Sequence, residues 1–217
     1  RAALGRMLEG AESILAQGVT FVEHPASRRR LAATSGRFTD VFTEHVTTAK
    51  TSLVTTLMRA TDTMRNYLGN ARVYAGGAGI RDLEGVARGC PAVVVSAGPS
   101  LARNVDLLAE SGVRERCVIV TAQTTLRPLL DRGIRPHFVT ALDYHEISRR
   151  FYEGLTEADL EGVTLLVDPK AHPAIIESFP GAVRCCASPV LDRMLGDAAP
   201  DHGELPAGAT VAHLSLY

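Results

Sequence analysis

The stretch Pro91-Ala-Val-Val-Val-Ser-Ala-Gly-Pro-Ser-Leu101 passes from a run of valines through a short turn into a helical pattern. Valine favours strands, and Gly98 allows a sharp turn or the close approach of a ligand. Pro99 suits a first helical turn, and Ser100 can accept hydrogen bonds from the free N–H groups there. The stretch therefore predicts a strand, a turn and a helix N-terminus, where anions and nucleotides bind in open α/β sheets. The alternative is a turn that only connects a strand to a helix.

Strands and helices alternate from Cys90 onward. Strand patterns fall at residues 92–96, 117–122, 137–142, 163–167 and 182–185. Helical patterns fall at residues 101–111, 126–132, 147–155, 173–179 and 189–195. Near-continuous apolar strands in this rhythm predict an α/β fold, a Rossmann-like parallel sheet with helices on both faces.

The chain before this sheet has a different character. Residues 1–72 show apolar side chains at intervals of three and four, which predicts a helical flank that Pro25 and Gly36 interrupt. Residues 73–89 hold several glycines and are predicted to be a linker. Residues 90–217 form the predicted sheet domain, truncated at its C-terminal end, so we expect the chain to be an internal part of a longer protein.

Composition excludes several classes of protein. The 217 residues carry a formal net charge of -1, which argues against a nucleic-acid-binding surface built on bulk charge. No apolar run reaches the length of a membrane span, so we expect no membrane partner. The four cysteines lack Cys-x-x-Cys spacing, and we therefore expect buried, reduced thiols in a cytoplasmic protein and no metal site.

Polar residues follow every predicted strand, at the sheet edge where ligands bind in such folds. Part of this set must be structural, because strand-to-helix loops are polar and hold helix N-caps. In chain order the candidates are Gly98, Pro99 and Ser100; Gln123, Thr124 and Thr125; Asp143, Tyr144, His145 and Glu146; Asp168, Lys170 and His172; and Ser188.

Asp143 is the strongest single candidate because it follows the mainly apolar residues 139–142 directly. Its carboxylate can hold a ribose hydroxyl, coordinate a metal or act as a base. Its alternative role is to cap the predicted helix that follows. His145 can transfer protons near neutral pH, and Lys170 and His172 can contact an anionic ligand.

A second glycine loop opens a helical pattern at residues 206–217. Thr210 lies near the expected helix N-terminus and, together with backbone N–H groups beside Gly208, can bind a phosphate or a carboxylate. His213 follows one turn later and is a candidate for proton transfer. A packed or hydrogen-bonded structural histidine is the alternative for His213.

Three stretches that occur in this order together resemble the motility-associated factor (Maf) glycosyltransferase family, which shares a domain with archaeal 6-hydroxymethylpterin diphosphokinases. They are Val93 to Leu101, Gly133-Ile-Arg-Pro136 before the strand that ends at Asp143, and Gly208-Ala-Thr-Val-Ala-His213. The resemblance covers about residues 90–217 and the helical flank. It implies a Rossmann-like core similar to bacterial sialyltransferases, a CMP-linked nonulosonic acid as the donor nucleotide sugar, and flagellin Ser or Thr hydroxyls as acceptors.

The resemblance also implies roles for individual residues. The donor nucleotide would be bound by Gly98, Pro99, Ser100, Thr124, Asp143, Gly208 and Thr210. The acceptor hydroxyl must lose a proton, and the catalytic candidates for this chemistry are Asp143, His145 and His213, with His172 as a competitor. No cofactor other than the donor is implied by this branch.

The diphosphokinase branch is the alternative. Its members carry an Asp-Leu-Asp-Gly run at the third strand and a later His-Gly-Asp-Asn run, whereas this chain has Ala141-Leu-Asp-Tyr144 and Asp201-His-Gly-Glu204. The missing carboxylate would weaken Mg²⁺ binding, so Mg²⁺ is expected only if the chain transfers a diphosphoryl group from ATP. His137, where the family often has Asp, is a further departure. A nucleotide-binding module without catalysis is a third possibility.

Overall fold

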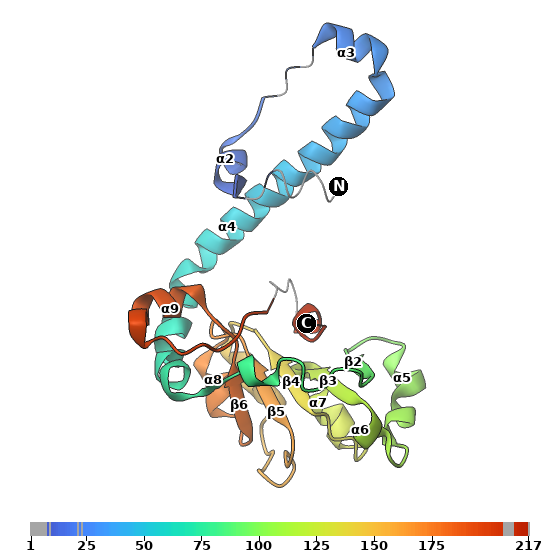
Figure 1. The fold of residues 1–217 in the computed structure, drawn as a ribbon, viewed down its shortest axis with the longest axis vertical. Helices are drawn as coiled ribbons and strands as arrows, with labels where there is room; N and C mark the ends of the chain where they lie inside the picture. Colours follow the sequence, from blue (N-terminus) through green and yellow to red (C-terminus); the bar gives the residue numbers. More distant parts are fainter. Residues whose placement is uncertain (1–7, 9, 21, 23, 206–210, 217) are drawn as a thin grey trace. The chain divides into compact units, whose positions relative to one another are not determined.

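The computed structural model describes residues 8, 10–20, 22, 24–205 and 211–216. It divides into two compact units, Arg1–Thr61 and Asp62–Tyr217. The predicted helical N-terminal segment is confirmed (Figure 1), and it consists of α2 (Glu12–Gln17), α3 (Pro25–Arg30) and α4 (Ala32–Gly76). None of the helices in the described ranges combines the length and the hydropathy that a membrane span requires.

Pro25 and Gly36 behave differently from each other in this segment. Pro25 is the first residue of α3, a position where its missing N–H would have no intrahelical partner in any case. Gly36 lies inside the 45-residue helix α4, so the expected interruption there is wrong. A glycine in a helix interior costs only about 1 kcal/mol relative to alanine, which the surrounding turns outweigh.

The second unit is built on a six-stranded parallel sheet with the order β1-β6-β5-β4-β3-β2. Five strands confirm the predicted ones, and β1 was not predicted because two residues are too short to show a periodic pattern. The strands are β1 (Ala78–Gly79), β2 (Ala92–Val95), β3 (Val118–Ala122), β4 (Phe138–Ala141), β5 (Thr164–Val167) and β6 (Ala182–Cys185). Residues 73–89 hold the end of α4, β1 and the 3₁₀ turn η1 (Arg81–Leu83).

The helices between the strands are shorter and less regular than the sequence patterns predict. Residues 101–111 form only α5 (Leu101–Asn104) and the 3₁₀ segment η2 (Val105–Ala109), and residues 147–155 hold the 3₁₀ segment η3 (Glu146–Phe151). Polar side chains that bond to nearby backbone groups compete with a regular helix. The other helical elements are α6 (Val113–Arg116), α7 (Gln123–Leu130), α8 (Pro173–Glu177), α9 (Pro189–Leu195), η4 (Gly196–Ala198) and α10 (Val211–Leu214).

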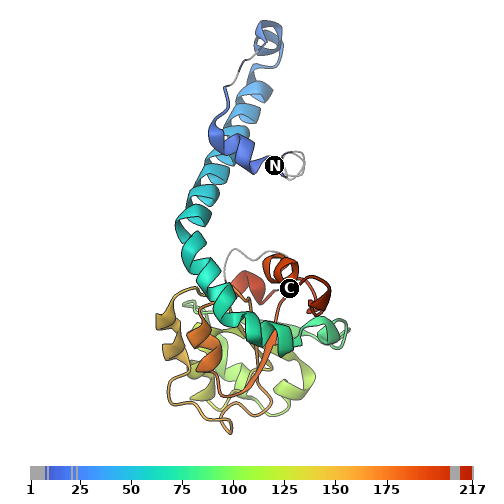
Figure 2. The same ribbon diagram turned by 90° about the vertical axis from the view of Figure 1, so that its left-hand side faces the viewer.

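Helices cover both faces of the sheet, as predicted. Leu165 and Val167 of β5 belong to the largest buried cluster, together with Ile175 of α8. Successive side chains of a strand point to opposite faces. Leu166 accordingly packs against a different cluster, which contains Leu214 of α10. The C-terminal part of α4 lies beside α8 (Figures 1 and 2). A Cβ on Gly69 of α4 would lie only 2.5 Å from Cγ of Pro173, the first residue of α8.

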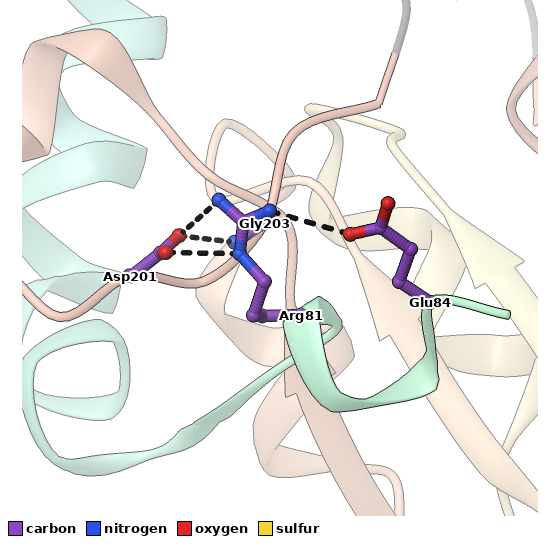
Figure 3. A network of polar contacts seen from close by, with 4 residues as sticks. All are labelled: Arg81, Glu84, Asp201 and Gly203. Carbon is purple, nitrogen blue, oxygen red and sulfur yellow. Dashed lines mark hydrogen bonds and ion pairs between the residues drawn. The ribbon is translucent and has the colours of Figure 1, made fainter. Parts of the chain in front are cut away.

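Strand β1 is held at the sheet edge by the segment around His202. The backbone N–H groups of Ile80 and Arg81 both donate to the carbonyl of His202, at 2.7 and 2.9 Å. Arg81 also makes a bidentate contact with Asp201, with two N–O distances of 2.9 Å, and an ion pair with Glu84 (Figure 3). The side chain of Asp201 accepts a further bond from the N–H of Gly203, so this edge is closed by a continuous polar network.

Replacing Gly79 with Ala should destabilise the second unit, because a Cβ there would lie 2.4 Å from the Cα of His202. We expect a loss of about 2–3 kcal/mol in the free energy of unfolding. Gly76→Ala is the matched control, since a Cβ at that position meets no atom within 4 Å. Urea unfolding followed by tyrosine fluorescence tests this, because the chain has no Trp and its five tyrosines all lie in residues 62–217. Equal stability of the two variants would contradict the close packing.

Asp201→Asn should lower stability in a pH-dependent manner, because the hydrogen bond and charge of Arg81 lower the pKa of Asp201. A lowered folded-state pKa stabilises the protein above the unfolded-state pKa, near 4, and this stabilisation is lost as the pH falls through the folded-state value. Wild type and Asp201→Asn should therefore differ at pH 7 and converge in acid. Glu161→Gln is the control, because Glu161 pairs with Arg135 at a longer 3.5 Å. A difference that stays constant down to pH 2 would refute the prediction.

Candidate functional site

The carboxyl ends of the strands carry the predicted site residues. Strands β2 to β6 follow one another across the sheet in chain order, so no reversal of strand order among them marks a ligand crevice. Neighbouring strands lie about 4.8 Å apart. The loops after β2, β3 and β4 therefore fall within about 10 Å of one another, a span that one nucleotide can bridge, and the contacts between loops define the site.

The Gly98-Pro99-Ser100 turn is exposed at the end of β2. Ser100 occupies the N-cap position of α5, but its side chain makes no capping hydrogen bond, so that expectation is wrong. Since α5 has only four residues, few aligned peptide dipoles add up at its start. Gly98 does not adopt a positive φ, and a Cβ there would meet only Ser100 Oγ, at 3.9 Å. The turn thus offers an open hydroxyl and backbone groups rather than a strong helix dipole.

Asp143 is half-buried at the end of β4 and uses both carboxylate oxygens. Oδ1 accepts a hydrogen bond from the backbone N–H of His145 at 3.2 Å and lies 3.3 Å from Nδ1 of the same residue. Oδ2 accepts a short hydrogen bond from Ser148 Oγ. Because His145 is the N-cap residue of η3, Asp143 both fixes the start of η3 and faces the imidazole.

His145 is the predicted base whose surroundings suit that role. When Nδ1 donates to the Asp143 carboxylate, the neutral ring leaves Nε2 without a proton, ready to accept one. The side chain is 58% exposed, so an acceptor can reach it. The ring of Tyr144 packs against the imidazole, with 3.8 Å between the ring centroids.

The loop after β5 lies next to this segment and carries Lys170. Asp168 Oδ1 accepts from the backbone N–H of Lys170 at 2.9 Å, a contact typical of a turn that begins at Asp168. Lys170 Nζ lies 2.8 Å from Asp168 Oδ2 and the Lys170 side chain is 39% exposed. The backbone N–H of His172 donates to the carbonyl of Asp143 at 2.9 Å, which joins the loops after β4 and β5.

Several other predicted polar residues have structural roles. His172 Nδ1 accepts from Ala174 N–H and caps α8, and Ser188 Oγ accepts from Leu191 N–H and caps α9. Polar residues that follow strands commonly serve as such N-caps.

The three polar residues after β3 differ in exposure. The side chain of Gln123 is buried and hydrogen-bonded to Tyr152, and that of Thr125 is buried and hydrogen-bonded to Thr121. The side chain of Thr124 is exposed.

The second glycine loop is only partly described. Gly208 and Thr210 lie outside the described residues, and His213 lies in α10 with its side chain outside them. Helix α10 is anchored where Thr140 Oγ1 and Ser215 Oγ lie 2.6 Å apart. This contact places α10 against β4, the strand that leads to Asp143.

The remaining histidines singled out by the sequence are structural. His137 Nδ1 accepts from the backbone N–H of Ile119 at 3.1 Å, at the opposite end of β4 from Asp143. Burial, with a smaller contribution from the charge of Arg114, lowers the pKa of His137. His202, in the near match to the kinase run, is buried, and its Nε2 lies 2.7 Å from the carbonyl oxygen of Tyr74.

Burial and the charge of Asp168 shape the electrostatics at the ends of β5 and β6. Burial is the main cause that raises the pKa of Cys185 to about 11 and that of Cys186 to about 12, and Asp168 adds to both shifts. The same two causes raise the pKa of Tyr67. All four cysteines are free, but Cys90 is exposed and Cys117 is half-buried, so the expectation of buried thiols is confirmed only for Cys185 and Cys186.

Sequence reasoning missed the contribution of α4 to this edge of the sheet. Asn66 and Asn70 are buried, and their side-chain amides donate to backbone carbonyls of the loops after β4 and β5. Tyr74 donates to Asp192 Oδ1 at 2.6 Å and accepts from the N–H of Ser188 at 2.9 Å. The signal was a polar pair four residues apart in a helix, where Asn has low propensity.

A family model matches this chain, and one solved structure shows a distant similarity to it. The family model described as "6-hydroxymethylpterin diphosphokinase MptE-like" matches residues 65–217. A solved Maf glycosyltransferase from Magnetospirillum magneticum AMB-1 is similar at 22% identity and a TM-score of 0.45, over 58% of this chain and 21% of that one. This chain thus spans about a fifth of the length of that protein. No curated protein matches the chain.

The family match covers all six strands, the Asp143–His145 pair and the turns of α4 that hold it. It supports a transferase of this superfamily. Matched over more than half of its length, this chain belongs to the 6-hydroxymethylpterin diphosphokinase MptE-like family.

Proposed function

We propose that this chain is the donor-binding domain of a nucleotide-dependent glycosyltransferase, which moves a nonulosonic acid from a CMP donor to protein hydroxyls such as those of flagellin. Family membership supports a transferase, and the order of the Gly98-Pro99-Ser100, Asp143 and Gly208 stretches favours the glycosyltransferase branch. The observation that carries the proposal is the Asp143–His145 pair, at 3.3 Å, at the sheet edge that also holds the open turn after β2.

The donor would lie across the ends of β2, β3, β4 and β5. The Gly98-Pro99-Ser100 turn and the exposed Thr124 offer a hydroxyl and backbone groups to the nucleotide phosphate. Lys170, half-exposed beside its partner Asp168, supplies a positive charge for the carboxylate of the sugar. Thr210 and Gly208 are proposed to complete the donor site.

In the transfer step, the acceptor hydroxyl oxygen forms a bond to the anomeric carbon of the donor. The bond from that carbon to the phosphate oxygen breaks, and CMP leaves with the electron pair. His145 Nε2 takes the hydroxyl proton, and the Asp143 carboxylate stabilises the imidazolium that forms. His213 remains a second candidate for this base. Free thiols fit a reaction in the reducing cytoplasm.

Transfer of a diphosphoryl group from ATP to a pterin is the second candidate, favoured by the description of the family model. Mg²⁺ supports such chemistry through one or two carboxylates and the phosphates. Asp143 follows β4 without a second acidic residue beside it, and both its oxygens already accept hydrogen bonds. The described residues contain no cluster of three or more potential metal ligands. The arrangement around Asp143 therefore fits an orienting carboxylate better than a Mg²⁺ ligand.

Calorimetric titration of the 217-residue chain with CMP and with ATP, each with Mg²⁺ or EDTA, tests the proposal. We expect CMP to bind equally well in EDTA, and Ser100→Ala to weaken CMP binding by about tenfold or more, because a hydrogen bond to a charged group contributes about 1.5–3 kcal/mol. Ser100 is exposed and caps no helix N–H, so its removal should leave folding intact.

Ser111→Ala is the matched control, since Ser111 is exposed at the far end of the same β2–β3 connection. Equal CMP affinity in Ser100→Ala and Ser111→Ala would show that the Gly98-Pro99-Ser100 turn is not part of the donor site. Binding of ATP alone, and only with Mg²⁺, would favour the diphosphokinase. Binding of CMP without release of CMP from a CMP-sugar would favour a module that binds nucleotides without catalysis.

A further inference from the structure

Asn66 connects the two loops that carry the proposed base and the proposed cation. Its side-chain amide donates to the carbonyl of Tyr144 at 3.2 Å and to that of Lys170 at 2.9 Å. Tyr144 lies between Asp143 and His145 in the chain. One buried amide group therefore fixes the backbone beside the base and the backbone of the lysine at the same time.

Asn70, one turn later, fixes the second loop alone. Its amide donates to the carbonyls of Pro169 and Ala171, at 2.8 and 2.7 Å. Together with the bond from Asn66, these bonds supply a side-chain donor from α4 to each of the three consecutive carbonyls of residues 169–171. Each of these buried carbonyls would otherwise carry the cost of an unsatisfied polar group. These bonds restrain the loop after β5 where Lys170 emerges.

The loop after β4 is held by Asn66 through the carbonyl of Tyr144. Its other connections to the neighbouring loop in the described structure include the bond from His172 N–H to the Asp143 carbonyl, at 2.9 Å. Asp143 orients His145 from within this same loop. A shift of Tyr144 relative to Lys170 would therefore move the base relative to the bound donor.

We infer that Asn66 is a positioning residue of the proposed transferase: its amide sets the separation between the Asp143–His145 segment and Lys170, and so aligns the acceptor's base with the donor's anion site. This inference rests on the proposed function. Alignment of this kind governs the chemical step, because a misplacement of about 1 Å can lower a rate by about 10²-fold. Asn66 touches neither substrate and acts through the two loops.

Asn66→Ser is the informative variant. Serine keeps a polar side chain that can bond within its own helix, but it is too short to reach both carbonyls, so the bridge between the loops is lost. Tyr74→Phe is the matched control, because Tyr74 lies on the same face of α4 but holds Ser188 and Asp192 after β6. Both variants remove a buried hydrogen bond from the same helix, so a general loss of stability affects both.

The first measurement is amide hydrogen exchange in the 217-residue chain. In Asn66→Ser, the N–H of His172 should exchange about tenfold faster or more, with Ser188 unchanged, and Tyr74→Phe should show the reverse pattern. The second is release of CMP from CMP-N-acetylneuraminic acid. We expect kcat to fall about tenfold or more in Asn66→Ser with KM for the donor changed less than about threefold, and kcat to be unchanged in Tyr74→Phe.

Each outcome decides a different claim. Unchanged exchange at His172 in Asn66→Ser overturns the connection between the loops, whatever the activity of the chain. Faster exchange with unchanged kcat, or an equal fall of kcat in both variants, overturns the positioning role and leaves the proposed function standing. If wild type neither binds CMP nor releases it from the donor, the proposed function fails and the catalytic role of Asn66 fails with it.

Discussion

The polar ladder of Asn66, Asn70 and Tyr74 on α4 holds together the carboxyl edge of the sheet. Each side chain satisfies backbone groups in the loops that follow β4, β5 or β6. Buried backbone carbonyls are costly when they lack a donor, and the side chains of α4 supply donors to the loops after β4 and β5. The end of α4 is therefore an integral part of the sheet domain, which agrees with a family match that begins at residue 65.

The proposed chemistry at this edge depends on loops rather than on a helix N-terminus. The Gly98-Pro99-Ser100 turn is followed by only four α-helical residues, which limits the dipole available to a phosphate. Asp143 instead supplies a charged group whose two oxygens are aimed by Ser148 and His145. Rigid loops can hold a reacting pair in place as well as a helix can, provided that buried donors such as Asn66 fix their backbone.

Local patterns predicted the regular part of the fold well. The valines of β2 and the apolar runs of β3 to β6 are long enough to show their period, and Pro173 and Pro189 mark the helix starts that His172 and Ser188 cap. The sequence could not indicate which polar residues would be caps and which would face a partner. Asp143 shows why, since its carboxylate serves the start of η3 and the ring of His145 together.

The sequence by itself determined the parallel α/β sheet, because near-continuous apolar runs and turn chemistry act over a few neighbouring residues. It also selected Asp143 and His145, which stand two residues apart. Only the tertiary structure decided that β1 joins the sheet through Gly79 and His202, residues separated by more than a hundred positions. The same holds for Asn66, whose partners follow 78 and 104 positions later. Such contacts depend on how distant segments satisfy each other's buried polar groups, and a local sequence pattern cannot predict these long-range pairings.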